Sequence, residues 1–252
     1  PLKGRDIKET PNGFHFHGRE FKVFKSRDLP PGAKIKDGTN FSRDARGNWF
    51  LNVCIEVEQP EQRPMRTGVG IDLGLKSFAA LSNGETIDNP RHFRRLEEKL
   101  GKAQRARKKR QTANIHARIV NTRRDFLHKL SRRLVNEFDY IAVGNVSASK
   151  LAKTSMAKSV ADVSWSSFRA MLAYKAIKHG AWFEEVNESF SSQVCSSCGT
   201  LPDSRPRGIA DLGVRQWVCS GCGVVHDRDT NAALNILARH GHVPPVVGIP
   251  AL

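Results

Sequence analysis

Two Cys-x-x-Cys pairs limit the architecture of this chain more than any other feature. The motifs "CSSC" and "CSGC" are separated by twenty residues and contain Cys195, Cys198, Cys219 and Cys222. This spacing is typical of two thiolate turns that close a tetrahedral site around one zinc ion. A glycine follows each pair, where backbone amides have to turn toward the sulfurs. Because cysteine fills all four positions, we expect a structural zinc ion; two copies at this spacing argue against a redox C-x-x-C.

The overall charge of the chain indicates a polyanionic partner. The 252 residues are 39% hydrophobic, enough for a sizeable core, and carry a formal net charge of +16. Nucleic acid is therefore the expected partner, and a cationic protein for ribosome or membrane surfaces is the alternative. The sequence contains no apolar run long enough to span a bilayer and no signal peptide. We expect a cytoplasmic protein, and a start at Pro1 without Met indicates a fragment or a processed chain.

The first sixty residues predict antiparallel β-structure. Short apolar runs such as "GFHFHGREFKVFK" and "DARGNWFLNVCIEVE" alternate with Gly, Pro and Asp turns. The fifth cysteine, Cys54, lies in the second of these runs and is expected to be a core residue. The stretch "QPEQRPM" ends the pattern. From Thr67 onward, "VGIDLGLKSFAALSNGETI" predicts two strands joined by a turn, at the start of a new domain.

A strongly basic helical region is predicted over residues 91–137. It contains no proline, and its apolar residues recur at helical spacing. Between Arg91 and Arg133 there are sixteen Lys and Arg but three acids, and like charges at this density repel one another along a helix. We therefore predict contacts with nucleic acid here; a solvated helix face is the alternative. The predicted contact residues are Lys102, Arg105, Arg107, Lys108, Lys109, Arg110, Arg123 and Arg124.

The stretch "DYIAVGN" predicts a buried strand that ends at Gly144. A helix around "SWSSFRAMLAYKAIKHG", with Gly180 as its C-cap, and a strand "AWFEEVNES" follow. Strands and helices that alternate in this way form an α/β core around a central sheet. The tail "HVPPVVGIPAL" is expected to be loosely ordered.

Two aspartates lie at positions where an ordinary core would exclude them. In "GIDLG", Asp72 lies in an apolar strand between Gly70 and Gly74, which would leave room for a ligand. In "DRDTNAALNIL", Asp229 shares a helix face with the apolar residues that have to pack on the sheet. A buried acid is costly unless it binds a cation. The alternatives are a turn former at Asp72 and a helix N-cap at Asp227 or Asp229.

In their order along the chain, "GIDLGLKSFAAL", the basic helical region, "SQVCSSCG" and "CSGCGVVHDRDTNAALNIL" resemble the transposon-encoded TnpB family and its type V CRISPR effector relatives. The resemblance covers residues 67–240. It implies an α/β nuclease of RuvC-like RNase H fold, with a mixed sheet and helices, interrupted by a zinc ribbon. The start of the chain resembles the latter half of the family's β-rich wedge domain. The implied domains are a partial wedge domain, the first part of the nuclease, the zinc ribbon, the final nuclease helix and a flexible tail: residues 1–66, 67–190, 191–224, 225–240 and 241–252.

The resemblance also implies a set of catalytic acids, with one departure from the family pattern. Asp72 matches the first catalytic Asp and Asp229 the last, but the middle acid normally ends the strand matched by "YIAVGN", where this chain has Gly144. Some members carry a displaced Glu just before the first cysteine turn, and "VNESFSSQVC" offers Glu188 there. Because the carboxyl ends of neighbouring strands open onto one crevice, we expect the Glu188 carboxylate to fill the space at Gly144. The alternative is that Glu188 is an ordinary loop acid.

The resemblance further implies DNA cleavage directed by a guide RNA in a prokaryotic cell. Asp72, Glu188 and Asp229 would hold two Mg²⁺ or Mn²⁺ ions about 4 Å apart for phosphodiester hydrolysis. Base pairing of the guide RNA would select the target DNA, held as an RNA–DNA heteroduplex with a displaced single strand. Two alternatives are a nuclease-dead RNA-guided DNA-binding protein or repressor, and a guide-independent DNA-binding accessory protein of a transposon.

Overall fold

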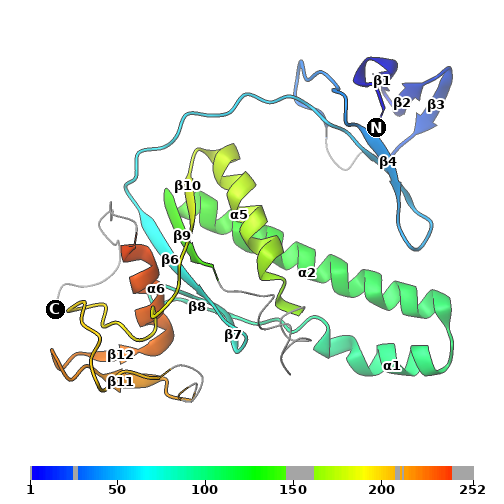
Figure 1. Ribbon diagram of the computed structural model, residues 1–252. Helices are drawn as coiled ribbons and strands as arrows, with labels where there is room; N and C mark the ends of the chain where they lie inside the picture. Colours follow the sequence, from blue (N-terminus) through cyan, green and yellow to red (C-terminus); the bar gives the residue numbers. More distant parts are fainter. Residues whose placement is uncertain (1, 25–27, 146–161, 208–210, 212, 240–252) are drawn as a thin grey trace. The chain divides into compact units, whose positions relative to one another are not determined.

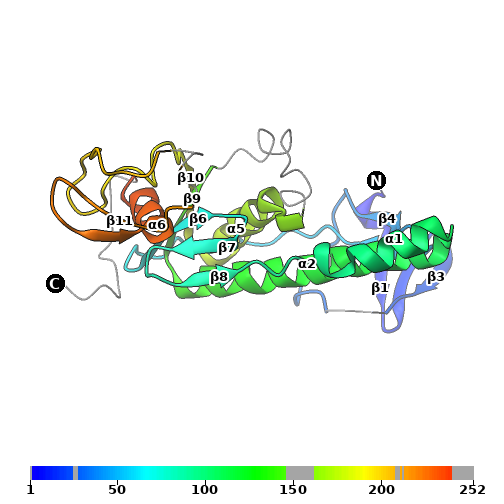
Figure 2. The same cartoon turned by 90° about the horizontal axis from the view of Figure 1, so that it is seen from below.

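The computed structural model describes residues 2–24, 28–145, 162–207, 211 and 213–239. Two compact units make up this chain. The first comprises Pro1–Gln59 and Leu100–His116, and the second comprises Pro60–Lys99 and Ala117–Leu252. Figures 1 and 2 show the elements coloured along the sequence. The tail predicted to be flexible, 241–252, lies outside the described residues.

The first unit contains the predicted antiparallel β-structure. After a 3-10 turn (η1, Gly4–Asp6), one sheet joins β1 (Ile7–Thr10), β2 (Gly13–Phe16) and β3 (Arg19–Lys22) in order, and a separate hairpin joins β4 (Asn40–Arg43) to β5 (Trp49–Asn52). The prediction that Cys54 is a core residue is wrong, because its side chain is exposed. The residue follows a two-stranded ribbon whose side chains are themselves largely exposed, so alternation along this segment does not produce a buried face.

The basic region is helical, as predicted, but it is broken into separate helices. A 3-10 turn (η2, Arg94–Leu96) leads into α1 (Glu97–Arg105), and α2 (Lys109–Glu137) follows after a tight turn. Arg107 has a left-handed backbone (φ 52°), and the Lys108 amide donates to the Ala103 carbonyl at 3.0 Å, which ends α1. The turn and the adjoining helix ends belong to the first unit, a grouping that the sequence did not predict.

A mixed five-stranded sheet organises the second unit. Its order is β10-β9-β6-β7-β8, formed by Trp182–Val186, Tyr140–Gly144, Gly68–Leu73, Ser77–Leu81 and Thr86–Asp88. Strand β9 runs parallel to its two neighbours, β6 and β10, whereas β7 runs antiparallel to its two neighbours, β6 and β8. The predicted hairpin after Thr67 and the predicted α/β core are therefore confirmed.

Helices cover both faces of this sheet (Figures 1 and 2). Ile141 and Val143 of β9 point into a core shared with α2 and α5 (Trp165–His179), and the alternate residues Tyr140 and Ala142 pack with α6 (Arg228–Ala238). The left-handed Gly180 (φ 67°) ends α5, as predicted. Because side chains alternate along a strand, Gly144 also faces α6. No helix in the described part of the chain is long and apolar enough to cross a bilayer.

Gly70 lets α6 lie directly on β6. A Cβ atom at position 70 would lie 2.0 Å from the Ala233 carbonyl oxygen and 2.8 Å from the Leu237 nitrogen. The prediction that this glycine leaves room for a ligand is therefore wrong, since a helix backbone fills the space. The helix starts where β12 (Val225–Asp227), paired with β11 (Gln216–Val218), ends. Asp227 is the N-cap, and its carboxylate accepts from the Thr230 amide at 2.9 Å.

Candidate functional site

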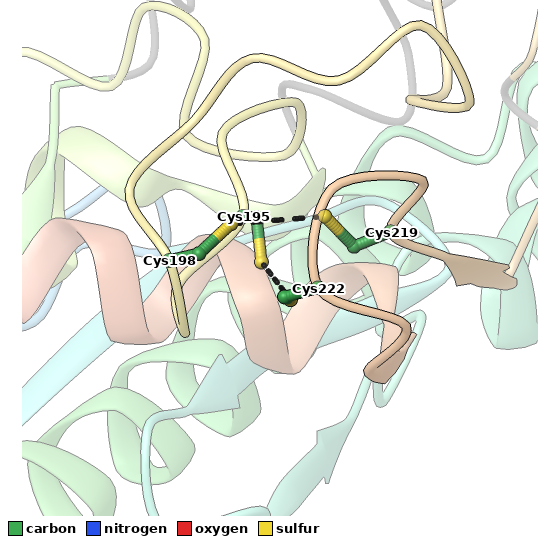
Figure 3. A group of neighbouring side chains, drawn as sticks. All are labelled: Cys195, Cys198, Cys219 and Cys222. Carbon is green, nitrogen blue, oxygen red and sulfur yellow. Dashed lines mark hydrogen bonds between the residues drawn. The ribbon is translucent and has the colours of Figure 1, made fainter.

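The four cysteines of the two C-x-x-C motifs converge on one point. All four sulfur atoms lie within 4.8 Å of one another, and Figure 3 shows the side chains meeting from two opposed turns. The Sγ atoms of Cys195 and Cys222 are 3.7 Å apart, and those of Cys198 and Cys219 are 3.8 Å apart. Four thiolates at this separation fit a tetrahedral zinc site with no open position, so the donor set suits a structural zinc ion.

The two turns have the same backbone geometry. The Gly199 amide donates to the Cys195 carbonyl and the Gly223 amide to the Cys219 carbonyl, each at 2.8 Å. Both glycines are left-handed, with φ 72° and 74°, as expected of residues that redirect the backbone after each pair. Backbone amides inside each turn hydrogen-bond the first sulfur of the pair. The Thr200 hydroxyl, 3.1 Å from the Cys198 sulfur, lowers the pKa of that thiol to about 6, together with a backbone hydrogen bond from the same residue.

His226 contacts the cysteine cluster and was not among the predicted site residues. Its Nε2 lies 3.0 Å from the Cys195 sulfur, and its buried ring packs on Trp217 with centroids 4.8 Å apart. The residue lies on β12, opposite Trp217 of β11. His226 lies outside the C-x-x-C spacing, so that spacing does not indicate its role. The one indication in the sequence was its position directly before the N-cap Asp227.

The predicted acids gather on the face of the sheet that carries α6. Gly70 of β6 pairs with Ala142 of β9 and Ile71 with Val143, so Asp72 and Gly144 lie side by side one residue further on. Gly144 in turn pairs with Val186 of β10, and Glu188 follows two residues later on the same face. An acid at position 144 would therefore lie beside Asp72, whereas Glu188 has to reach back across one strand.

The Glu188 side chain does reach back over Gly144. A Cβ atom at position 144 would lie 2.7 Å from Glu188 Oε2 and 3.2 Å from Glu188 Cβ, with Ile236 Cδ1 of α6 at 3.1 Å. The Glu188 carboxylate thus occupies the space that a side chain on the end of β9 would fill, as the sequence predicted. The Glu188 amide donates to Asn145 Oδ1 at 3.3 Å, which holds the loop close to the end of β9.

Burial disfavours the ionised forms of Asp72 and Glu188. Burial, followed by the negative charges of Glu188 and then Asp229, raises the pKa of Asp72 to about 8, while the charge of Arg228 opposes the shift. Burial also raises the pKa of Glu188, against the opposing charges of Arg169 and Arg239. A buried acid such as Asp72, whose ionised form is also disfavoured by neighbouring carboxylates, fits a site that a cation completes.

Asp229 lies in the first turn of α6, where Arg215 holds it. The Arg215 Nη1 donates to Asp229 Oδ2 at 2.7 Å, from the segment just before β11. Arg215 was not among the predicted site residues. Its place between the two C-x-x-C pairs gave no indication that it would reach the helix that follows them.

The three acids do not form a compact ligand cluster of the kind that the cysteines form. Among the described residues, the four cysteines are the one group of three or more His, Cys, Asp or Glu side chains placed to hold a metal ion together. Asp72, Glu188 and Asp229 therefore do not form a closed cage for a single ion. Magnesium is commonly held by one or two carboxylates together with water and substrate phosphates, which suits such an open set of oxygen ligands.

Most of the predicted nucleic-acid contacts are on the surface. Seven of the eight side chains are exposed: Lys102, Arg105, Arg107, Lys108, Lys109, Arg110 and Arg124. Arg123 differs from these, because its Nη2 lies 3.1 Å from the buried carboxylate of Asp162. The structure thus argues against Arg123 as a surface contact, since its charge neutralises an internal acid. The sequence could not show this, because Asp162 is far from Arg123 along the chain.

A cavity of about 820 Å³ lies elsewhere in the second unit, between β8, η2 and α2. Its walls include Ile87, Leu96 and Phe126. None of the three predicted catalytic acids lines it. The cavity therefore adds nothing to the carboxylate site.

Comparison with known proteins agrees with this arrangement. A family model described as "Cas12f1-like, TNB domain" matches residues 165–236, and one described as "Probable transposase" matches residues 52–155. A Streptomyces pristinaespiralis protein named "Putative RNA-guided DNA endonuclease" is 42% identical over 84% of this chain and 55% of its own length. "TnpB-like protein L79" of Acanthamoeba polyphaga mimivirus is 28% identical over 87% of this chain and 41% of its own length. The chain belongs to the TnpB family.

The relatives of this TnpB-family chain are longer than the chain itself. It spans about half the length of the curated relatives that it matches, including 54% of InsQ from Escherichia coli, to which it is 28% identical. A solved structure titled "Cryo-EM structure of the Cas12f1-sgRNA-target DNA complex" aligns with 81% of this chain and 55% of its own chain, with a TM-score of 0.50 and 18% identity. This likeness supports the fold, which is mixed α/β with a four-cysteine zinc ribbon.

Proposed function

We propose that this chain carries the nuclease centre of an RNA-guided DNA endonuclease, in which Asp72, Glu188 and Asp229 hold two divalent metal ions. The names of its relatives support the reaction class. The observation that carries the proposal is the position of the Glu188 carboxylate, which lies 2.7 Å from where a Cβ atom of residue 144 would be. This carboxylate takes the place of the acid that the family pattern expects at the end of β9.

The environment of Asp72 supports a metal-dependent reaction. A carboxyl group whose pKa is raised to about 8 is largely protonated at neutral pH, and burial, followed by the charges of Glu188 and Asp229, causes this rise. A divalent cation would reverse this balance, because it favours the ionised form of every acid around it. The carboxylate oxygens suit Mg²⁺ or Mn²⁺.

The residues of this chain would position the ions and the substrate strand. When bound, two such ions supply an activated water and stabilise the leaving 3′ oxygen of the phosphodiester. Asp72 would release its proton as the ions bind. Arg215 orients the Asp229 carboxylate through its 2.7 Å hydrogen bond, and Asn145 holds the backbone of Glu188.

The exposed basic residues would bind the nucleic-acid backbones. Lys108, Lys109 and Arg110 lie at the turn and at the start of α2, where several cations are within one or two turns of each other. Such a cluster would contact phosphates of a guide RNA and of target DNA, independent of base sequence. Base pairing with the guide would then select the target.

The test is cleavage of a matched DNA target by the protein that carries this chain, with its guide RNA and Mg²⁺. Glu188→Gln and Asp72→Asn remove one charge each without changing side-chain size, and we expect each to lower the cleavage rate by on the order of 10² to 10³-fold. Glu184→Gln is the matched control. It removes an acid from the same face of β10, keeps an acceptor for the Tyr140 hydroxyl, and should leave cleavage within about twofold of wild type.

Each other outcome would favour a different function. Unchanged cleavage by Glu188→Gln would contradict the displaced acid. Specific guided binding without cleavage by wild type would favour a DNA-binding protein or repressor. Binding of DNA without any defined bound RNA would favour a guide-independent accessory protein.

A further inference from the structure

Two buried asparagines of α6 hold the loop that follows Glu188. Asn235 Nδ2 donates to the carbonyl oxygens of Ser191 and Val194, each at 2.7 Å. Asn231 Nδ2 donates to the same two oxygens, at 3.3 and 2.8 Å. Asn231 is 1% exposed and Asn235 is 9% exposed. Each loop carbonyl therefore accepts two amide hydrogen bonds from one helix.

The loop held in this way begins with Glu188. The Ser191 amide donates to the Glu188 carbonyl at 3.0 Å, which closes a turn directly after the acid. On the other side, the Glu188 amide donates to Asn145 Oδ1. The backbone of Glu188 is thus fixed between the end of β9 and the face of α6, so its side chain starts from a defined point.

The same helix face also holds the first cysteine turn. Asn231 Oδ1 accepts from the Ser196 amide at 2.9 Å, and Ser196 lies between Cys195 and Cys198. Asn231 thus contacts both the Glu188 loop and the first C-x-x-C turn, whereas Asn235 contacts the Glu188 loop. A second link runs from Arg215, located between the two cysteine pairs, to Asp229.

We propose that Asn231 and Asn235 are positioning residues for Glu188, and that through Asn231 the zinc site helps to place this acid. The inference rests on the proposed function of Glu188 as a metal ligand. A Glu that reaches across a strand to replace a missing neighbour has a longer path to the ions than an acid on β9. Hydrogen bonds that fix its backbone remove freedom that would otherwise weaken the site.

Packing alone does not explain these residues. Two amides on the buried face of a helix cost free energy unless each donor and acceptor is satisfied, and an apolar side chain would fill the same space without that cost. Both asparagines direct their donors to the same two carbonyls, which indicates that the loop position is what they determine. Because the bonds are doubled, a single substitution leaves one donor on each carbonyl.

The test measures metal binding and loop protection instead of activity alone. Mn²⁺ affinity of the full protein is measured by electron paramagnetic resonance, and hydrogen exchange is measured on the peptide that spans residues 187–195. Asn235→Ala should weaken Mn²⁺ binding about tenfold and raise exchange in this peptide, while zinc content stays unchanged. The double variant Asn231→Ala with Asn235→Ala should weaken Mn²⁺ binding further and also lower zinc retention against a chelator. Ser131→Ala, which removes a buried hydrogen bond within α2 and one acceptor of the Lys175 ammonium, is the control and should change neither quantity.

A double-mutant cycle separates positioning from general destabilisation. In a Glu188→Gln background, Asn235→Ala should have no further effect on Mn²⁺ affinity, because the ligand it positions has been removed. An equal loss in both backgrounds, or a lower melting temperature with unchanged Mn²⁺ affinity, would overturn the proposal.

The Mn²⁺ binding and hydrogen-exchange measurements also separate this inference from the proposed function. If wild-type protein binds Mn²⁺ no more tightly than Asp72→Asn does, the metal site itself is contradicted. Exchange in residues 187–195 would then still report whether the asparagines hold the loop.

Discussion

The cysteine site and the carboxylate site differ in how the chain builds them. The four cysteines come from two short turns with matching hydrogen bonds, and their sulfurs lie within 4.8 Å of one another. The three acids come from β6, the loop after β10 and the start of α6, and they meet only because the sheet and α6 bring distant segments together. In a ligand set built from local turns, the sequence position of every ligand is fixed. A ligand set that forms where neighbouring strands end can take an acid from either of two strands.

The largest effect is expected from a substitution that breaks the cysteine site. Cys219→Ser should abolish zinc retention and unfold the ribbon, because zinc binding contributes on the order of 10 kcal/mol to the folding of small four-ligand sites. Metal content and thermal unfolding measure this directly. Cys54→Ser is the control, since Cys54 is an exposed cysteine outside the cluster, and it should retain one zinc per chain. Full zinc content in Cys219→Ser would contradict the four-cysteine assignment.

A smaller effect tests whether the carboxylate site tolerates an exchange of strands. Gly144→Ala places a methyl group 2.7 Å from Glu188 Oε2 and should lower cleavage by about 10²-fold, because it displaces the carboxylate by roughly 1 Å. Gly213→Ala adds the same group where no atom lies within 4 Å and should cleave like wild type.

The same experiment has a rescue arm. Gly144→Glu combined with Glu188→Ala moves the acid onto β9 and should recover cleavage well above that of Glu188→Ala alone. Failure of this rescue, with both single variants folded, would show that the acid position is fixed by more than the available space.

The smallest expected effect is a dependence on pH that only the carboxylate site should show. The pKa of Asp72 is raised to about 8, so protons compete with metal, and Mn²⁺ affinity should rise up to about tenfold per pH unit below 8 and level off above it. Without metal, the raised pKa stabilises the folded state below the ordinary pKa of an aspartate, and this stability is lost as the pH rises through 8. Isothermal titration at pH 6, 7, 8 and 9 measures the first effect; Asp72→Asn should flatten the curve. A slope that is unchanged in Asp72→Asn would assign the proton to another group.

The two sites also differ in how much the sequence could predict. The spacing of the cysteines predicts their cluster completely, because four ligands in two turns need no knowledge of the rest of the fold. Asp72 and the α6 face of Asp229 follow from the periods of a strand and a helix. The reach of Glu188 over Gly144 was predicted from a resemblance and from the order of strands, since one missing acid and one extra acid were visible in the sequence.

Other residues could not be predicted because their partners are far away along the chain. Arg123 looks like one more surface cation, yet it neutralises buried Asp162. Arg215 and His226 reach their sites only through the fold of the ribbon. Cys54 follows an alternating pattern that indicates a buried face, but a two-stranded ribbon does not cover it.

The contact at Gly70 limits which substitutions this sequence can tolerate, and it does so more strictly than the space at Gly144 does. Asp72 lies two residues beyond Gly70 on β6, and Asp229 lies one helical turn before Ala233, whose carbonyl would be 2.0 Å from a Cβ atom at position 70. Moving the middle acid between neighbouring strands exchanges side chains within space that already exists. Any side chain at position 70 would instead push α6, with its acid, away from the sheet. Of the two glycines, Gly70 is therefore the costlier one to replace, because its neighbours are helix backbone atoms, whereas the nearest atom at Gly144 is the end of the Glu188 side chain.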